Sequence, residues 1–312
     1  MLKYVLKRLG YILVTLWVIV TCTFFMMKNL PGTPFDAERF SIMTPQQQER
    51  VLEMYGLNDS LPMQYVKYIK NMLKGDLGTS FTYVNQDVSK VITGRLGPSA
   101  LIGIQAVLIG LAIGLILGIL AAWKHNSGID YFTMILAVLG VSVPNFVAAA
   151  LLQYYIGLKW GVLPVGFWTG WNCSVLPSIA LSFSATAMVA RFMRTEMLDV
   201  LDQDYIVTAR AKGLSQMKVL MRHAVRNSIL PVVTILGPIV VNLMTGSLAV
   251  ENIFSIPGIG SLFVDCIKAN DYPVIMGITI FYAAFYMLIV LLVGLAYSLI
   301  DPRIRLAKGK ES

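Results

Sequence analysis

Six runs of uncharged, mostly apolar residues, of about the length that crosses a lipid bilayer, constrain this chain more than any other feature. They cover residues 9–27, 98–122, 132–158, 175–190, 227–250 and 274–300. Roughly 20 apolar residues span a bilayer as a helix, because a helix satisfies its own backbone hydrogen bonds. A mean hydropathy of +0.69 and only 13% charged residues also exclude an ordinary soluble domain. We therefore predict an all-α polytopic membrane protein with six transmembrane helices.

The fourth run is the shortest. The uncharged stretch begins at Trp160, but Gly161, Pro164 and Gly166 make its first half typical of an outer loop. The first run follows basic residues, as a secretion signal does, yet it is longer than a signal core and lacks a small-residue cleavage site. We expect it to remain as the first membrane helix.

Basic residues in the short loops predict the orientation. Lys3, Lys7, Arg8, Lys124 and the basic residues within 191–226 and 303–310 all fall on one side, whereas the opposite short loops carry only Lys159 and Lys268. Cytoplasmic loops are enriched in Lys and Arg, so both termini are expected in the cytoplasm of a multi-pass protein of the plasma or inner membrane. The net charge of +8 reflects this bias, and nothing indicates a nucleic-acid partner.

Residues 28–97 form the one sizeable external region. Thr44, Pro45 and Gln47 are typical of a helix start with a capping box, and Gly56 ends that helix. A second helix is predicted over residues 63–74. The region is too short and too polar for a core of its own, so this small helical insert is expected to lean on the spans.

A charged, helix-patterned island lies between the fourth and fifth runs. Asp204 can cap a helix over residues 205–212, Gly213 can take the left-handed position that ends it, and Ser215 restarts the helix. Two sides are predicted on the second helix, a basic one with Lys218, Arg222 and Arg226 and an apolar one with Met217, Leu220, Met221 and Ala224. The pattern predicts a rigid elbow offered to something outside the membrane.

This island resembles the cytoplasmic coupling loop of ABC importer permeases. The resemblance is strongest to the branch that transports oligopeptides, dipeptides and nickel. Within that branch, the chain is most similar to the B permease subunit of oligopeptide permeases. The resemblance is carried by the sequence ARAKGL at residues 209–214, by Arg222-His223-Ala224 and by Ile229-Leu230-Pro231. Further similar segments are Leu30-Pro31-Gly32, Gly75-Asp76-Leu77-Gly78 with Ser80, residues 245–263 and Asp301-Pro302-Arg303-Ile304-Arg305. One departure is that Val207, Thr208 and Ala209 stand where the general pattern has Glu-Ala-Ala.

The resemblance covers residues 1 to about 306 and implies a type I ABC importer permease fold. It implies a first helix and insert in residues 1–97, a transmembrane domain in 98–305 with the coupling loop at 191–228, and a cytoplasmic tail in 306–312. The implied partners are a homologous second permease, two cytoplasmic ATPase subunits and an extracytoplasmic substrate-binding protein. The implied activity is ATP-driven import of short oligopeptides by alternating access, with dipeptides or a nickel chelate as alternative substrates.

Two groups of site residues follow from the resemblance. The ATPase-coupling contact is assigned to Tyr205, Ala209, Arg210, Ala211, Lys212, Gly213 and Leu214. External gating and docking of the binding protein are assigned to Asp76, Gly78, Glu251, Pro257, Gly258 and Gly260. Glu251 is expected at the outer mouth, where it either meets a substrate amine or is satisfied by backbone amides.

The absence of charges from the predicted spans indicates where the energy comes from. Secondary transporters and pumps usually keep ionisable residues in their spans, and none of the six runs contains one. The chain also has no GxxxxGK[ST] phosphate loop, so ATP and Mg²⁺ are expected on partner subunits and no cofactor or enzymatic activity on this chain. A passive channel would also lack charged spans, but no selectivity-filter sequence is found.

Other candidate chemistry is sparse. His125 and His223 are the only histidines and lie in different segments, which argues against a metal site. Cys173 and Cys266 both fall outside the predicted spans and could pair, although nothing in the sequence places their loops side by side. No Ser, His and Asp set gathers on one side of the membrane, so hydrolysis is not predicted.

Overall fold

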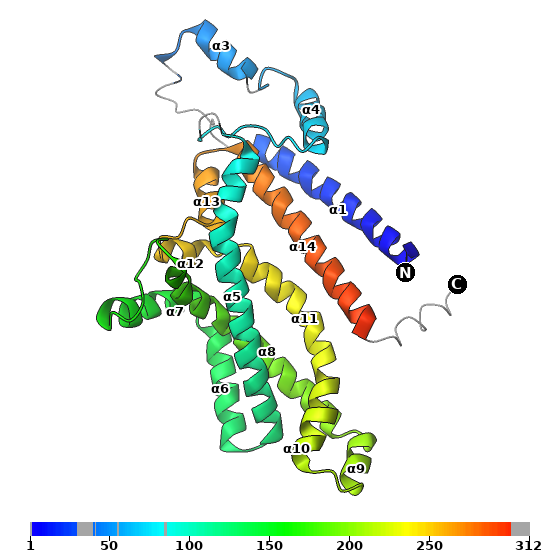
Figure 1. The fold of residues 1–312 in the computed structure, drawn as a ribbon. Helices are drawn as coiled ribbons and strands as arrows, with labels where there is room; N and C mark the ends of the chain where they lie inside the picture. Colours follow the sequence, from blue (N-terminus) through cyan, green and yellow to red (C-terminus); the bar gives the residue numbers. More distant parts are fainter. Residues whose placement is uncertain (1, 30–39, 41, 55, 84–85, 301–312) are drawn as a thin grey trace. The chain divides into compact units, whose positions relative to one another are not determined.

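The computed structural model describes residues 2–29, 40, 42–54, 56–83 and 86–300 (Figure 1). The chain divides into two compact units: unit 1 contains Met1–Gly97 and Gly258–Phe285, and unit 2 contains Pro98–Pro257 and Tyr286–Ser312. Two long helices, α5 (Val88–Trp123) and α14 (Tyr272–Ile300), contribute residues to both units. In the described ranges every named element is helical, which confirms the predicted all-α class.

Five helices in the described part of the chain are long and apolar enough to cross a membrane. These spans contain α1 (Leu2–Lys28), α5, α8 (Val175–Leu201), α11 (Arg226–Met244) and α14. The short 3₁₀ turn η2 (Trp171–Ser174) directly precedes α8 in the chain. A sixth is reached only if one sharply bent helix pair is taken as a single span. The predicted six spans are therefore reached when the bent pair is counted as one span.

The bent pair covers the third predicted span, residues 132–158. Helix α6 (Gly128–Ser142) stops, and α7 (Asn145–Leu152) with the π-helix η1 (Gln153–Lys159) departs at 100°. Pro144 explains the break: a residue before proline is pushed out of the helical region, and Val143 has φ −79° and ψ 119°. The third predicted span is therefore present as a broken pair of helices rather than as one continuous helix.

Other spans differ from prediction at their ends. Helix α8 continues to Leu201, past the predicted end at residue 190, and α5 begins at Val88, before the predicted start at residue 98. The fifth span is interrupted after α11, where Gly246 has φ +87°, and α12 (Leu248–Ile253) follows. Pro257 lies between α12 and α13 (Ile259–Lys268), and the last span starts at Tyr272 with α14.

Small residues let the helices of unit 2 approach closely. Gly110, Gly114 and Gly118 follow one another at four-residue intervals on α5 and lie against α8. A Cβ on Gly110 would come within 2.7 Å of Ala185 Cβ, and one on Gly114 within 2.7 Å of Val189 Cβ. In lipid the hydrophobic effect does not drive helices together, and stripes of small residues instead allow close van der Waals packing between them. The stripe therefore lets α5 pack directly against α8.

The insert of unit 1 is built largely as predicted. Helix α3 (Pro45–Met54) starts with the expected capping box, since Thr44 N donates to Gln47 Oε1 at 2.9 Å and Gln47 N donates to Thr44 Oγ1 at 3.4 Å. Gly56 follows with φ +66°, and α4 (Leu61–Leu73) begins slightly before its predicted start.

The insert leans on the first span, as expected for a segment without its own core. The hydroxyls of Thr21 on α1 and Tyr65 on α4 lie 2.7 Å apart. The ring of Phe24 packs edge-on against Tyr65, with centroids 5.4 Å apart. The similar segments predicted at residues 30–32 and 301–305, and the tail 306–312, lie outside the described residues.

Candidate functional site

The predicted elbow is present between α8 and α11 in unit 2. It comprises α9 (Asp204–Ala211), a turn, α10 (Gln216–Lys218) and the π-helix η3 (Val219–Val225). Figure 1 shows α9 and α10 at the end of unit 2 where α8 and α11 converge. We call residues 204–225 the elbow. Its place in the chain, directly after one long helix and before another, makes it a connector with structure of its own.

A small core of its own holds the elbow in shape. Ile206 is 0% exposed, Ala209 6% and Val219 2%, and these side chains pack together with Val200 and Leu201 at the end of α8. Ala209, which was assigned to the coupling contact, is thus an internal residue of the elbow. Burial of the three side chains fixes α9 against η3.

The turn of the elbow depends on Gly213. This residue has φ +79°, and its N–H donates to Arg210 O at 2.9 Å, while Leu214 N donates to Ala209 O at 3.3 Å. The predicted left-handed end of the helix is therefore confirmed. The predicted cap is wrong, because Asp204 is the first residue of α9 and Gln203 precedes it without a side-chain capping bond.

The outer surface of the elbow is unusually apolar. Tyr205, Val207, Leu214, Met217 and Met221 are each between 37% and 59% exposed. Arg210, Ala211, Lys212 and Gly213 are exposed beside them. Seven residues were assigned to this contact, and all of them except Ala209 are therefore at the surface.

The methionines correct one prediction. Met217 and Met221 were expected on the same side as Leu220 and Ala224, but Leu220 and Ala224 are buried and both methionines are exposed. The π-helical turn of η3 changes the number of residues per turn and so shifts the register. Val207, Met217 and Met221 were not assigned to the site from the sequence. The sequence feature that could have identified them is that each is an apolar residue within a charged segment outside the membrane.

Polar contacts tie the elbow to the long helices. Asn227 Nδ2 donates to Tyr205 OH at 3.0 Å, and Ser228 Oγ donates to Glu196 O at 3.1 Å. Nearby in sequence to the elbow, Arg194 of α8 donates from Nε and Nη2 to both oxygens of Asp130 on α6, at 2.6 and 2.7 Å. This paired contact, with Asp130 2% exposed, joins the start of α6 to the last turns of α8.

The residues assigned to an external gate do not form one cluster within a unit. Asp76, Gly78, Gly258 and Gly260 belong to unit 1, whereas Glu251 and Pro257 belong to unit 2. Asp76 Oδ1 accepts a hydrogen bond from Gly78 N at 2.8 Å, which closes a tight turn. Gly258 is the residue before α13, and Gly260 lies buried in its first turn.

Glu251 is enclosed rather than placed at an open mouth. It is 2% exposed, and it accepts a hydrogen bond at 2.7 Å from the hydroxyl of Ser99 on α5. A buried carboxylate needs such donors, because an unpaired charge is costly away from water. The expected rim position is therefore corrected, and the contact joins α12 to α5 within unit 2.

A second buried carboxylate organises unit 1. Asp271 is fully buried and accepts hydrogen bonds from Ser80 Oγ, from Phe81 N at 3.2 Å and from Thr82 N at 3.0 Å. Ser80 Oγ in turn accepts from Tyr83 N at 2.8 Å. This network, which we call the Asp271 latch, fastens the loop after α4 to the start of α14. It explains why a serine stands at residue 80.

Two family matches cover nearly the whole chain. Residues 114–306 match the family described as binding-protein-dependent transport system inner membrane component, and residues 1–96 match the family described as its N-terminal membrane component. The chain belongs to this family. It is therefore a multi-pass membrane permease.

Similar permeases include "Dipeptide transport system permease protein DppB" of Lactococcus lactis, which is 46% identical over 98% of this chain and 100% of the relative. DppB of Bacillus subtilis is 43% identical over 99% of both chains. "Oligopeptide transport system permease protein OppB" of Haemophilus influenzae is 38% identical over 98% of this permease and 100% of the relative.

A solved structure supports the fold of the permease. The crystal structure of an amino acid ABC transporter with histidines matches with a TM-score of 0.51 over 69% of this permease and 94% of that chain. At 18% identity the match concerns the fold alone. Together with the family match it confirms the predicted type I importer permease fold.

The cysteines of the permease are free thiols, so the considered Cys173–Cys266 pairing is not formed in this structure. Burial, with a smaller contribution from nearby carboxylates, raises the pKa of Cys266 to about 12. Within the residues described here, no three His, Cys, Asp or Glu side chains gather at a distance suited to a metal ion.

Proposed function

We propose that this permease is the transmembrane subunit of an ATP-driven importer of short peptides. Relatives of nearly equal length are named as dipeptide and oligopeptide permeases, and they share 38–46% of its residues. The partners that we propose are a homologous second permease, two cytoplasmic ATPase subunits and an extracytoplasmic binding protein. ATP and Mg²⁺ would bind to the ATPase subunits.

The observation that carries the proposal is the exposed apolar surface of the elbow. Five apolar side chains, each at least 37% exposed, lie on a segment that is held rigid from within. Clustered exposed apolar side chains, rimmed by polar residues, mark protein–protein contact sites. The exposed residues of the same segment include the basic Arg210 and Lys212. A soluble subunit that docks on the elbow would bury this surface.

The proposed orientation follows from the same segment. The elbow lies within residues 191–226, where basic residues concentrate, so we place it in the cytoplasm together with both termini. The insert of unit 1 is then external. This arrangement puts the ATPase contact and the insert on opposite sides of the bilayer, as a binding-protein-dependent importer requires.

Alternating access is the mechanism that this geometry favours. Because the core around Ile206 fixes α9 against η3, force on the elbow reaches α8, which continues without a break from Leu201 to Val175. Helix α8 in turn packs on the glycine stripe of α5. Movement of the elbow by an ATPase would therefore shift packed helices as a body rather than bend a loop.

Reconstitution of the complete complex into proteoliposomes tests the proposal. We expect uptake of a labelled di- or tripeptide that needs the binding protein and ATP, with vanadate abolishing it. Comparison of dipeptides, longer oligopeptides and a nickel chelate assigns the substrate. Peptide flux that persists without ATPase subunits would contradict the proposal and favour a passive channel.

A further inference from the structure

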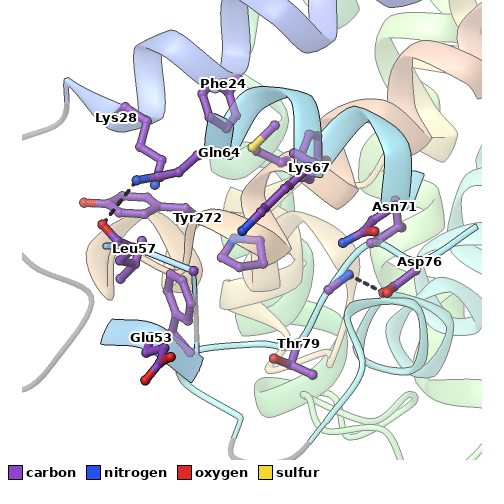
Figure 2. A pocket seen from close by; sticks show the side chains of 17 residues that line it. Phe24, Lys28, Glu53, Leu57, Gln64, Lys67, Asn71, Asp76, Thr79 and Tyr272 are labelled. Atoms are coloured by element: carbon purple, nitrogen blue, oxygen red, sulfur yellow. Dashed lines mark hydrogen bonds between the residues drawn. The ribbon is translucent and has the colours of Figure 1, made fainter. Parts of the chain in front are cut away.

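Unit 1 contains a pocket with a volume of about 340 Å³, which we call the insert pocket (Figure 2). Its walls come from the end of α1, from α3 and α4, from the loop after α4 and from the start of α14. Volumes of roughly 300–1,000 Å³ are typical of sites for small molecules. Two residues assigned to the gate, Asp76 and Gly78, line it, but that assignment gives the pocket no ligand.

Lys28 supplies a positive charge to this pocket. Its ammonium lies 5.8 Å from the centroid of the Phe24 ring and 5.9 Å from that of Tyr272, which holds it by cation–π attraction. No carboxylate among the described residues lies within 4.0 Å of it. Lys67, the other lysine of the pocket, is instead paired with Asp59 at 2.6 Å. Lys28 is thus the cation available to a bound anion.

Hydrogen-bond donors accompany Lys28. Tyr68 lines the same pocket, and its hydroxyl is shielded from solvent without a hydrogen-bond partner in the described part of the chain. Burial raises the pKa of Tyr68, so the hydroxyl keeps its proton. A shielded hydroxyl without a partner is uncommon in folded proteins and indicates a missing acceptor.

Carboxylates lie on another part of the wall. Figure 2 shows Lys28 and Phe24 along one margin of the pocket and Glu53 and Thr79 along another, with Asp76 on the loop after α4. Among the described residues no cation lies within 4.0 Å of the carboxylate of Glu53 or Asp76. The pocket therefore separates an unpaired positive charge from unpaired negative charges.

Rigid contacts keep these charges apart. Gln64 Nε2 donates to Leu57 O at 3.2 Å and to Asp59 O at 2.7 Å, which fixes the connection between α3 and α4. Leu57, Leu77, Phe81, Pro273 and Met276 supply apolar wall between the charged groups. A ligand with two opposite charges and a short apolar body matches this arrangement.

We propose that the insert pocket binds a short peptide with free termini, its carboxylate at Lys28 and Tyr68 and its ammonium group at Glu53 and Asp76. The inference deepens the proposed function and rests on it, because it places a second site for the same class of substrate outside the spans. Peptide held there would be retained close to the permease between deliveries by the binding protein.

A zwitterionic lipid headgroup shares this charge pattern, but the pocket favours a solute from water. Most of its residues come from the polar insert, between Glu53 and Phe81, and only two come from α1. We therefore commit to the peptide. Competition by phosphoethanolamine, the headgroup without its acyl chains, distinguishes the two sources.

Equilibrium binding of a labelled trialanine to the purified full-length permease, without binding protein or ATPase, tests the inference. Two modified peptides accompany it, one amidated at the carboxyl end and one acetylated at the amino end. The variants are Lys28→Met, which keeps an apolar side chain between the two rings, and Glu53→Gln. Lys70→Met on α4 and Glu49→Gln on α3 make the same chemical changes at residues outside the pocket and serve as controls.

We expect amidation and Lys28→Met each to weaken binding about tenfold or more, since a charged hydrogen-bonded contact is lost. Amidation should cost the Lys28→Met variant nothing further, because both changes remove the same contact. Acetylation and Glu53→Gln should show the same relation, and the controls should bind as the native chain does.

Three results would overturn the inference: no saturable binding of trialanine, binding of the amidated and acetylated peptides equal to that of trialanine, or displacement by phosphoethanolamine at lower concentration than by peptide. Uptake by the complete complex separates this failure from failure of the proposed function. If the complete complex takes up peptide but Lys28→Met does not change peptide binding, only the proposed insert-pocket site is refuted. Lys28-dependent binding without ATP-driven uptake refutes the proposed import function.

Discussion

The elbow and the insert are both built outside the spans, yet they solve different problems. The elbow is held from within by apolar contacts among Ile206, Ala209 and Val219, and it leaves apolar side chains on its surface. The insert is fastened by a buried carboxylate, Asp271, and presents a pocket with separated charges. An apolar surface on a rigid support suits a protein partner, whereas unpaired charges around a small cavity suit a solute. We therefore propose that the two regions bind different kinds of partner.

The largest expected effect tests the carboxylate side of the comparison. Asp271→Ala removes a buried carboxylate that accepts hydrogen bonds from Ser80 Oγ and from the N–H groups of Phe81 and Thr82. We expect a loss of about 3 kcal/mol in the free energy of unfolding, measured by thermal or denaturant unfolding in detergent. Asp265→Ala, at an exposed residue of α13, is the control. Equal losses in both variants would mean that the latch does not organise unit 1.

Gly213→Val tests the rigidity of the elbow. A β-branched residue at φ +79° costs about 1–3 kcal/mol, and the strain falls on the turn between α9 and α10. We expect ATP-driven uptake to fall sharply while membrane insertion and the fold of unit 1 remain. Gly213→Asn is the matched variant, because asparagine tolerates the left-handed region. Normal uptake by the valine variant would show that the turn is not part of the coupling device.

Val207→Asp tests the surface of the elbow without disturbing its core. Val207 is 59% exposed, so the fold should be kept, but a charge placed in an apolar contact should weaken ATPase binding roughly 10- to 100-fold. Val162→Asp, at a residue 67% exposed outside the elbow, is the control. The measurement is the affinity of the purified ATPase subunits for the permease in nanodiscs. Unchanged affinity would remove the distinction between the two regions.

The smallest effect concerns the enclosure of unit 1. In a chain whose other cysteines are replaced, Cys266 should react with a thiol reagent at pH 8 far more slowly than a cysteine introduced by Asp265→Cys. The reason is that Cys266 is 1% exposed and its pKa is raised to about 12. Rapid labelling at pH 8 would contradict this closed structure.

The raised pKa of Cys266 also predicts a pH dependence of stability. The thiol ionises near pH 9.0 in the unfolded chain but not in the folded chain, so the free energy of unfolding should fall as pH rises from about 9 to 12.

Local signals predicted the elements that local chemistry decides. The capping box at Thr44 and Gln47, the helix end at Gly56 and the turn at Gly213 each depend on a few neighbouring residues, and all three are confirmed. The break at Pro144 was also readable, but the apolar run around it was interpreted as one span. The four-residue glycine spacing on α5 also indicates a close helix contact, but only the structure identifies α8 as the partner helix.

Long-range contacts account for what the sequence did not show. Ser99 and Glu251 are 152 residues apart, and Ser80 and Asp271 are 191 apart, so nothing local pairs them. The exposure of Met217 and Met221 depends on the π-helical turn of η3, which a regular helical period does not produce. The insert pocket combines α1, α3, α4 and α14, and only folding brings these segments together.

Purification of the tagged permease from native membranes tests the central claim most directly. The native chain should retain a homologous permease and P-loop ATPase subunits with vanadate-sensitive activity. The Val207→Asp chain should keep the second permease and lose the ATPase subunits. Recovery of the native chain alone, as a homo-oligomer without ATPase activity, would contradict the account and make a passive channel the better description.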